Sequence, residues 1–128
     1  MHKFNIVIIV GCGGFIGAAL RYIISAKANK GIQIGIPMGT LIVNILGAVL
    51  IGFIMEMSKK SNISSELKTF LTTGIMGGLT TFSTFSYETI TLIGEGKVMM
   101  GGINAALNLF LSLIGVSLGM FLGRIIQH

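Results

Sequence analysis

The chain has 128 residues, of which 52% are hydrophobic and only 10% are charged, and its mean hydropathy is +0.90. An ordinary soluble domain carries about 25% charged residues, so this composition argues against a water-soluble domain and predicts a membrane protein. The net charge of +5 does not indicate binding to nucleic acid, because the basic residues are spread along the chain instead of forming one patch.

Four apolar runs predict an all-α fold of four transmembrane helices. They cover residues 4–25, 36–57, 67–93 and 99–126. A helix as long as either of the first two runs measures roughly 33 Å, against roughly 30 Å of bilayer hydrocarbon. None of the runs carries the polar stripe of a helix in a soluble bundle. The connectors are short, so we expect residues 1–128 to form a single domain of a multi-pass protein in the lipid bilayer.

The start of the first run also resembles a lipoprotein signal that ends at Cys12. The apolar sequence continues to Tyr22, however, where a cleaved signal would give way to a polar mature sequence. We therefore expect the first run to be retained as a transmembrane helix. Cys12 is the single cysteine, so no disulfide can form within the chain.

Glycines four residues apart recur in three of the runs and predict close packing of the helices. This spacing gives a helix a flat face on which another backbone can approach closely. The motif is common in membrane helices, so it indicates packing and not chemistry. The glycines are Gly13 and Gly17 in the first run, Gly74 and Gly78 in the third, and Gly115, Gly119 and Gly123 in the fourth.

The basic residues divide almost equally between the two sides of the membrane. Lys3, Lys59, Lys60, Lys68 and Arg124 fall on the side of the termini, and Arg21, Lys27, Lys30 and Lys97 on the other. The side with more Lys and Arg determines the orientation in the membrane, and a count of five against four hardly favours either orientation. Either one orientation wins narrowly, or copies insert both ways and form an antiparallel, dual-topology homodimer. Four helices enclose little room for a pathway, which favours a second subunit.

The third run, 67–93, is longer than a straight crossing requires, and its middle contains Gly77-Gly78 followed by Thr80-Thr81. Glycine lowers helix propensity by about 1 kcal/mol, and threonine hydroxyls can satisfy backbone groups freed by a broken turn. We expect the third helix to be broken near its middle, and such breaks commonly mark ion sites. A simple kink with hydroxyls bonded back to the helix is the alternative.

Phe82 and Phe85 follow the break and are expected to share one helix face. Two such phenylalanines alone would most often be core or lipid-facing residues. Here they alternate with hydroxyl-bearing residues, a pattern unsuited to a lipid-facing surface. An aromatic ring has an electropositive edge, so phenylalanines along a polar route could hold an anion. The interleaved residues are Ser83, Thr84, Ser86 and Tyr87.

Two further polar features indicate an anion route. Asn44 lies inside the second run, and its side-chain amide has two donor hydrogens. The fourth run carries a polar stripe at four-residue spacing, formed by Asn104, Asn108 and Ser112. Glu56 lies at the end of a run and Glu88 past the break, so we expect no carboxylate in the route, which suits an anion better than a cation. No catalytic set of residues is evident, and we expect no enzyme.

Three motifs together resemble one family. GGFIGAALRY at 13–22, GTLIVNILG at 39–47 and GIMGGLTTFSTFSYE at 74–88 resemble the Fluc (CrcB) family of fluoride ion channels. The resemblance implies a dual-topology homodimer in the cell membrane, in bacteria the inner membrane. It implies two antiparallel pores that let fluoride leave the cytoplasm passively, lowering its intracellular level and toxicity. It also implies a structural sodium ion at the dimer interface.

The resemblance also implies roles for individual residues. Phe82 and Phe85 match the pore phenylalanines, and Asn44 matches the pore asparagine. Gly77 and Thr80 match the positions whose main-chain carbonyls hold the sodium.

Four more residues are placed in the pore by this resemblance. Ser83, Thr84 and Ser112 resemble the hydroxyl track beside the phenylalanines. Arg21 matches an arginine near the end of the first helix, where it acts either on the anion or as an interfacial cation that anchors the helix end.

A small proton-coupled multidrug-type exporter with four helices is the alternative function. That mechanism needs a titratable acid deep in the membrane, typically in the first helix, and the first run contains none. A structural subunit without transport would leave the polar stripe unexplained.

Overall fold

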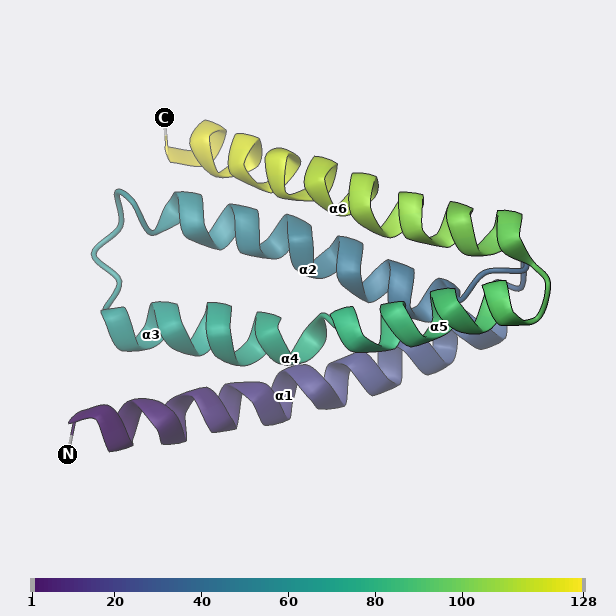
Figure 1. The fold of residues 1–128 in the computed structure, drawn as a ribbon. Coiled ribbons are helices and arrows are strands. Elements are labelled where there is room, and N and C mark those ends of the chain that lie inside the picture. The colour runs from purple at the N-terminus through teal and green to yellow at the C-terminus, as the bar shows by residue number, and fades with distance from the viewer. Residues whose placement is uncertain (1, 128) are drawn as a thin grey trace.

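The computed structural model describes residues 2–127, and the chain over that range folds into helices without any strand. Four rods lie side by side (Figure 1). Three are single helices, α1 (His2–Gly31), α2 (Met38–Met57) and α6 (Val98–Gln127). The third rod is interrupted and consists of α3 (Ser65–Thr69), the π-helix η1 (Phe70–Met76), α4 (Gly77–Leu79) and α5 (Phe82–Gly94).

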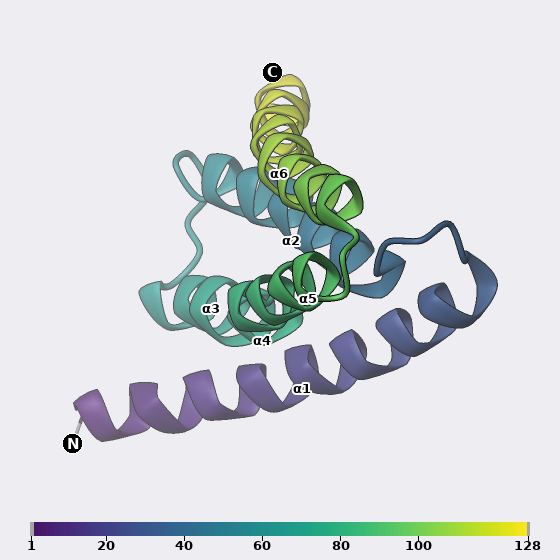
Figure 2. The ribbon, with the colours of Figure 1, turned by 45° about the vertical axis from the view of Figure 1, so that its right-hand side comes forward.

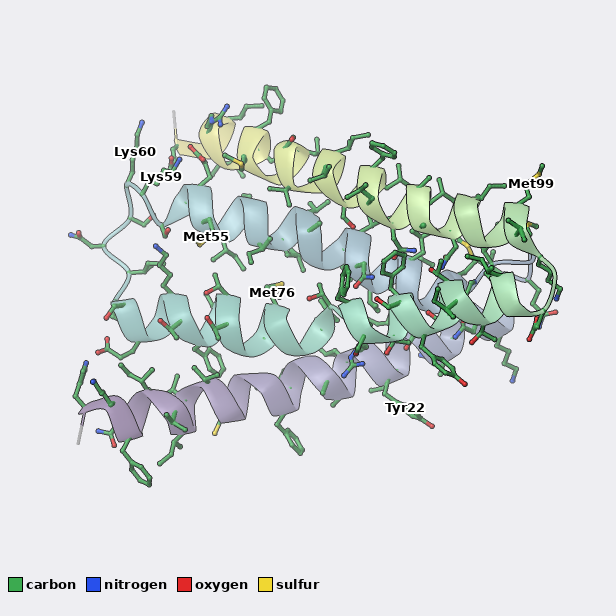
Figure 3. All side chains as sticks on the ribbon, viewed as in Figure 1. Tyr22, Met55, Lys59, Lys60, Met76 and Met99 are labelled. Carbon is green, nitrogen blue, oxygen red and sulfur yellow. The ribbon has the colours of Figure 1, made fainter. Side chains whose placement is uncertain are left out.

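The helices have the length and surface of a multi-pass membrane protein. Helices α1, α2 and α6 are each long and apolar enough to cross a bilayer, whereas the third rod is divided into shorter elements. Large apolar side chains cover the outside, and Phe15, for example, is 78% exposed. The fully apolar core is small and centres on Val43, Met76 and Leu79, with Met76 pointing from η1 toward α2 (Figure 3). The prediction of four helical runs is confirmed.

Helix α1 is longer than the sequence predicted. The expected end at Ser25 is wrong, because the helix continues to Gly31 and takes in most of the supposed connector. Alanine and lysine in that segment are strong helix formers. The chain turns only near Pro37, which immediately precedes α2. A helix of 30 residues measures about 45 Å, so α1 exceeds the thickness of the hydrocarbon.

The third rod lies between α1 and the α2–α6 pair (Figure 2). A Cβ at Gly119 of α6 would overlap the backbone carbonyl of Val49 in α2. A Cβ at Gly13 of α1 would lie 2.7 Å from the carbonyl oxygen of Phe70 and 2.9 Å from the Cα of Gly74. Backbones therefore approach one another directly at these positions, and the predicted close packing of the glycine faces is confirmed.

The break in the third rod lies at Thr80–Thr81. Both threonines are extended, with φ/ψ of −88°/159° and −151°/118°, whereas Gly77 remains helical at −61°/−38°. The expected break near the middle of the third helix is therefore present, and it lies at the threonines that follow Gly77-Gly78. The seven-residue π-helix η1, which α4 separates from the break, was not predicted; such wide turns are rare and are found frequently at functional sites.

Both ends of the described chain lie at the same end of the bundle as the α2–α3 turn, which carries Lys59 and Lys60 (Figures 1 and 3). Glu56 of α2 binds α6 at this end of the bundle. It is 7% exposed, and its carboxylate accepts from Lys59 Nζ at 3.1 Å and from Arg124 Nε at 3.3 Å. The Gln127 amide donates to the carbonyls of Glu56 and Met57, so the last turn of α6 is tied to the last turn of α2.

Candidate functional site

A pocket of about 410 Å³ lies where α2, α6 and the broken rod meet. No charged side chain of residues 2–127 lines it. Its walls combine apolar side chains with amides, hydroxyls and aromatic rings, and the lining includes Asn44, Thr72, Gly77, Thr80, Thr81, Phe82, Phe85, Asn108 and Ser112. Most of the residues that the sequence placed in a pore or a sodium site therefore gather here. Ser83, Thr84 and Arg21 do not line the pocket.

Asn44 clamps the break. Its Oδ1 accepts from the backbone N–H of Thr81 at 2.8 Å, and its Nδ2 donates to the Thr81 carbonyl at 3.2 Å. The same nitrogen donates to Asn108 Oδ1 at 3.0 Å. One side chain thus replaces both hydrogen bonds that an extended residue loses when it leaves a helix. The sequence offered both amide hydrogens to an anion, whereas within the single chain both are already bonded.

The start of α5 is capped by the threonines of the break. Thr81 is the N-cap residue, and its Oγ1 accepts from the Thr84 N–H at 3.2 Å and donates to Thr84 Oγ1 at 3.0 Å. The Thr80 hydroxyl donates back to the Met76 carbonyl at 3.0 Å. The Thr81 hydroxyl therefore satisfies a free N–H at the helix start, as the sequence predicted, whereas the Thr80 hydroxyl bonds back to a carbonyl that already accepts from the Thr80 N–H. Ser83 is exposed on the first turn.

Phe82 and Phe85 lie on one face of α5, as predicted. Their ring centroids are 5.5 Å apart with an interplanar angle of 63°, so the edge of one ring meets the face of the other. Phe82 is 79% exposed although it borders the pocket. Its ring edge is therefore free of protein contacts over most of its surface in the single chain.

The asparagines of α6 face inward. Asn104 is 1% exposed and Asn108 is 5% exposed, and the Asn108 amide donates to both the carbonyl and the Oδ1 of Asn104. Ser112 continues the stripe into the pocket. The predicted polar stripe is therefore present, but its first two members bond to protein groups.

Arg21 lies ten residues before the end of α1, so its predicted place near the end of the first helix is wrong. Its Nε donates to the Gly78 carbonyl at 2.9 Å, across 57 residues of sequence. A cation at the carboxyl end of α4 satisfies a carbonyl that has lost its helical partner. The sequence carried a signal for this contact, because Arg21 is a cation inside an apolar run and a cation buried there needs a hydrogen-bond acceptor.

Gly77 and Thr80 both border the pocket, one on each side of the last turn before the break. Across residues 2–127, no side-chain donor reaches the carbonyl oxygen of either residue. A Cβ added at Gly77 would meet only the Thr72 carbonyl oxygen, at 3.8 Å. Within the described chain, no cluster of three His, Cys, Asp or Glu side chains offers a metal site.

Glu88 lies on α5 one helical turn beyond Phe85, and its Oε1 is buried without a hydrogen-bond partner among the described residues. The sequence placed this residue past the break, where the structure also finds it. The buried, unpartnered oxygen was not predicted.

These features define a small multi-pass helical membrane protein in which a mainly apolar pocket with a few amide and hydroxyl groups lies at a broken helix, an arrangement typical of proteins that hold or conduct ions. The chain belongs to the CrcB family: the family model described as "CrcB-like protein, Camphor Resistance (CrcB)" matches residues 8–120. The resemblance seen in the sequence is thereby confirmed.

Individual relatives cover nearly the whole chain. A protein of Clostridium novyi is 61% identical over 127 residues, which are 98% of this chain and 99% of the relative. A protein of Campylobacter jejuni is 41% identical over 118 residues, covering 92% of this chain and 97% of the relative. One of Methanocaldococcus jannaschii is 40% identical over 120 residues, covering 94% and 92%. All three are named fluoride-specific ion channel FluC.

Proposed function

We propose that the chain is a fluoride-specific ion channel that lets fluoride leave the cytoplasm passively and so lowers its intracellular level and toxicity. The observation that carries the proposal is the near full-length identity of 61% with a relative named for this activity. The pocket agrees with it, because amide, hydroxyl and ring-edge groups line it without any charged side chain of the described residues. The channel would work in the cell membrane, in bacteria the inner membrane.

The chemistry of the pocket suits a small, strongly hydrated anion. Water can leave such an ion only where donors replace it at once. Ser112 offers a hydroxyl and Asn108 and Asn44 offer amides, while Phe82 and Phe85 present electropositive ring edges that attract an anion and disfavour a cation. Because the Asn44 amide already donates to Thr81 and Asn108, and the Asn108 amide already donates to Asn104, fluoride would share or displace those bonds.

Ser83, Thr84 and Arg21 lie outside the pocket, and we place them along the approaches to it. Ser83 and Thr84 occupy the first turn of α5 beside Phe82, so their hydroxyls would continue the polar track. Arg21 would raise the local positive potential while its Nε holds Gly78.

Ion flux from liposomes that contain the purified protein tests the channel. Fluoride efflux should be rapid without a pH gradient, while chloride is retained. A strict requirement for a proton gradient would refute a passive channel. The alternative, a proton-coupled exporter, would have to depend on Glu88, because α1 contains no acid and Glu56 is already paired with Lys59 and Arg124. Gradient-driven transport abolished in Glu88→Gln would favour that alternative.

We further propose that the working unit is an antiparallel, dual-topology homodimer. The large exposed ring of Phe82 beside the pocket supports this, since a second copy would cover the ring and close the pathway. Because Arg21 lies inside α1, it no longer counts among the cations at the membrane surface. Five cations then remain at the end with the termini and three at the other end, which is still a weak orientation signal. The three are Lys27, Lys30 and Lys97.

Cysteine labelling tests the two orientations. Cys12 is exposed, so it is first replaced by alanine. A single cysteine at Lys60 should then react with a membrane-impermeant reagent from both sides in about equal amounts. Reaction from one side alone would refute dual topology, and a monomer in mild detergent would refute the dimer.

A structural sodium ion at the dimer interface is the third part of the proposal. The main-chain carbonyls of Gly77 and Thr80 are oxygen donors of the kind that hard cations prefer, and no side-chain donor within residues 2–127 occupies them. Two copies would supply four such oxygens. When bound, the ion would neutralise carbonyls that otherwise lie unsatisfied in apolar protein.

A further inference from the structure

A directed chain of hydrogen bonds begins at the pocket wall and links α2 and α6 to α5. Asn44 Nδ2 donates to Asn108 Oδ1 at 3.0 Å, and Asn108 Nδ2 donates to Asn104 Oδ1 at 3.2 Å. Asn104 Nδ2 then donates to Thr89 Oγ1 at 3.0 Å, and the Thr89 hydroxyl donates to the Phe85 carbonyl at 2.8 Å. Each amide accepts on its oxygen and donates from its nitrogen, so the chain is consistent in direction from end to end.

The two ends of this amide relay bracket the segment that carries the phenylalanine pair. At one end Asn44 holds Thr81, the residue just before Phe82, through both backbone groups. At the other end Thr89, one turn beyond Phe85, is held by Asn104. The intervening turns of α5 therefore have one anchor on α2 and one on α6.

The part of the relay formed by Asn104 and Thr89 is not part of the pocket wall, unlike Asn44 and Asn108, and Asn104 is deeply buried. Asn104 is 1% exposed, and neither Asn104 nor Thr89 lines the pocket. An asparagine buried in an apolar bundle is unfavourable unless its amide is bonded, and here both sides of the amide are bonded. Packing alone would be served better by leucine at this position.

We propose that Asn104 and Thr89 are positioning residues, which act through the amide relay to fix the α5 turns bearing Phe82 and Phe85 in the orientation that ion passage requires. They do not touch the ion. The transport part of this inference rests on the proposed function, whereas the anchoring of α5 does not.

Three substitutions separate anchoring from general packing. Thr89→Val keeps the shape of the side chain but removes the hydroxyl that links Asn104 to α5, and Thr89→Ser restores that hydroxyl. Asn104→Leu removes the amide while keeping a similar volume. The matched control is Ser117→Ala, because Ser117 is an exposed α6 residue whose hydroxyl bonds only to Leu113 of its own helix.

Two measurements are made on each purified full-length protein: fluoride and chloride efflux from liposomes, and backbone hydrogen exchange followed by mass spectrometry. Thr89→Val and Asn104→Leu should slow fluoride efflux by about tenfold, the factor that corresponds to one buried hydrogen bond of about 1.4 kcal/mol. Exchange should rise by about the same factor in residues 81–89 and stay unchanged in residues 113–127. Thr89→Ser and Ser117→Ala should match the parent protein. The double variant should be no worse than the worse single variant, because both break one link.

Parent-like exchange in residues 81–89 of Thr89→Val would overturn the proposal, whether or not efflux changes. Equal defects in Thr89→Val and Thr89→Ser would overturn it too, since the hydroxyl would then not matter. If Asn104→Leu fails to fold, the two threonine variants still decide the question. A parent protein that conducts no fluoride would refute the proposed function, while the exchange comparison would still test the relay.

Discussion

Replacing Asn44 by aspartate should damage the protein more than removing the side chain altogether. The substitution preserves shape and keeps the oxygen that accepts from the Thr81 N–H at 2.8 Å. It turns the donor nitrogen into a second carboxylate oxygen, which then faces the Thr81 carbonyl at 3.2 Å and Asn108 Oδ1 at 3.0 Å. Two attractive contacts become repulsive ones, and a negative charge enters the proposed anion route.

The structure sets the size of the effect. Each acceptor left without its donor costs about 1–3 kcal/mol, so the two together cost about 2–6 kcal/mol before the charge is considered. This is a large part of a typical folding free energy of about 5–15 kcal/mol. In Asn44→Ala these two acceptors and also the Thr81 N–H lose their partner, but the vacated space adjoins the pocket, where water can bond to all three groups. We therefore expect stability to fall in the order parent, alanine, aspartate.

Thermal unfolding in detergent and fluoride efflux from liposomes measure the two consequences. Asn29→Asp is the matched control, because the Asn29 Oδ1 accepts from the Gly39 N–H at 2.7 Å near the start of α2 and an aspartate keeps that bond. A negative charge at a helix N-terminus should stabilise by about 0.3–1 kcal/mol. An Asn44→Asp protein as stable as Asn29→Asp, or more stable than Asn44→Ala, would refute the assignment of Asn44 as the clamp of the break.

Three further perturbations test other parts of the molecule. Phe82→Ile or Phe85→Ile should abolish most fluoride efflux. The cost in stability should be only about 0.5–1.5 kcal/mol from the lost ring pair, since Phe82 is largely exposed. Normal efflux in both variants would show that the rings serve only in packing. Gly119→Ala should lower stability by about 1–3 kcal/mol, because the added methyl group would overlap the Val49 carbonyl. Gly102 has open space around it, so Gly102→Ala should be neutral or stabilising by up to about 1 kcal/mol. Equal melting temperatures of the two variants would contradict the backbone contact at Gly119. Exchange of sodium for a large organic cation during purification should weaken the dimer on size-exclusion chromatography, and a sodium gradient should neither drive nor limit fluoride flow; full activity without sodium would exclude the ion site.

The features that depend on local sequence were predictable. Run length and hydropathy gave four helices, and the spacing of Phe82 and Phe85 placed both rings on one face of α5. Glycines four residues apart correctly indicated where backbones meet, because a helix face without side chains allows close approach of whichever helix packs against it. The break was expected within a few residues because threonines and glycines weaken a helix wherever they occur together.

What depended on distant partners was not predictable. The Asn44 amide was expected to point at an anion, but it finds Thr81 across 37 residues of sequence. Arg21 was assigned to a helix end, but its acceptor is the Gly78 carbonyl, 57 residues away. A polar side chain in an apolar run needs a hydrogen-bond partner, but the sequence alone does not identify which residue that partner is. The π-helix η1, which packs against α1, was not predicted either.

The order of the rods along the chain has a consequence for biosynthesis. Asn44 emerges with α2, but Asn108 belongs to α6, which leaves the ribosome later than α2. At about 5–20 residues per second, synthesis of the roughly 70 residues from Met57 to Gln127 takes about 4–14 s. During that interval α2 resides in the translocon or the bilayer with its asparagine lacking the α6 partner, and the glycine face that receives α6 stays open. A nascent chain stalled before α6 should therefore be more sensitive to membrane proteases than a chain that includes α6, and quality control would act on this protein chiefly before α6 docks.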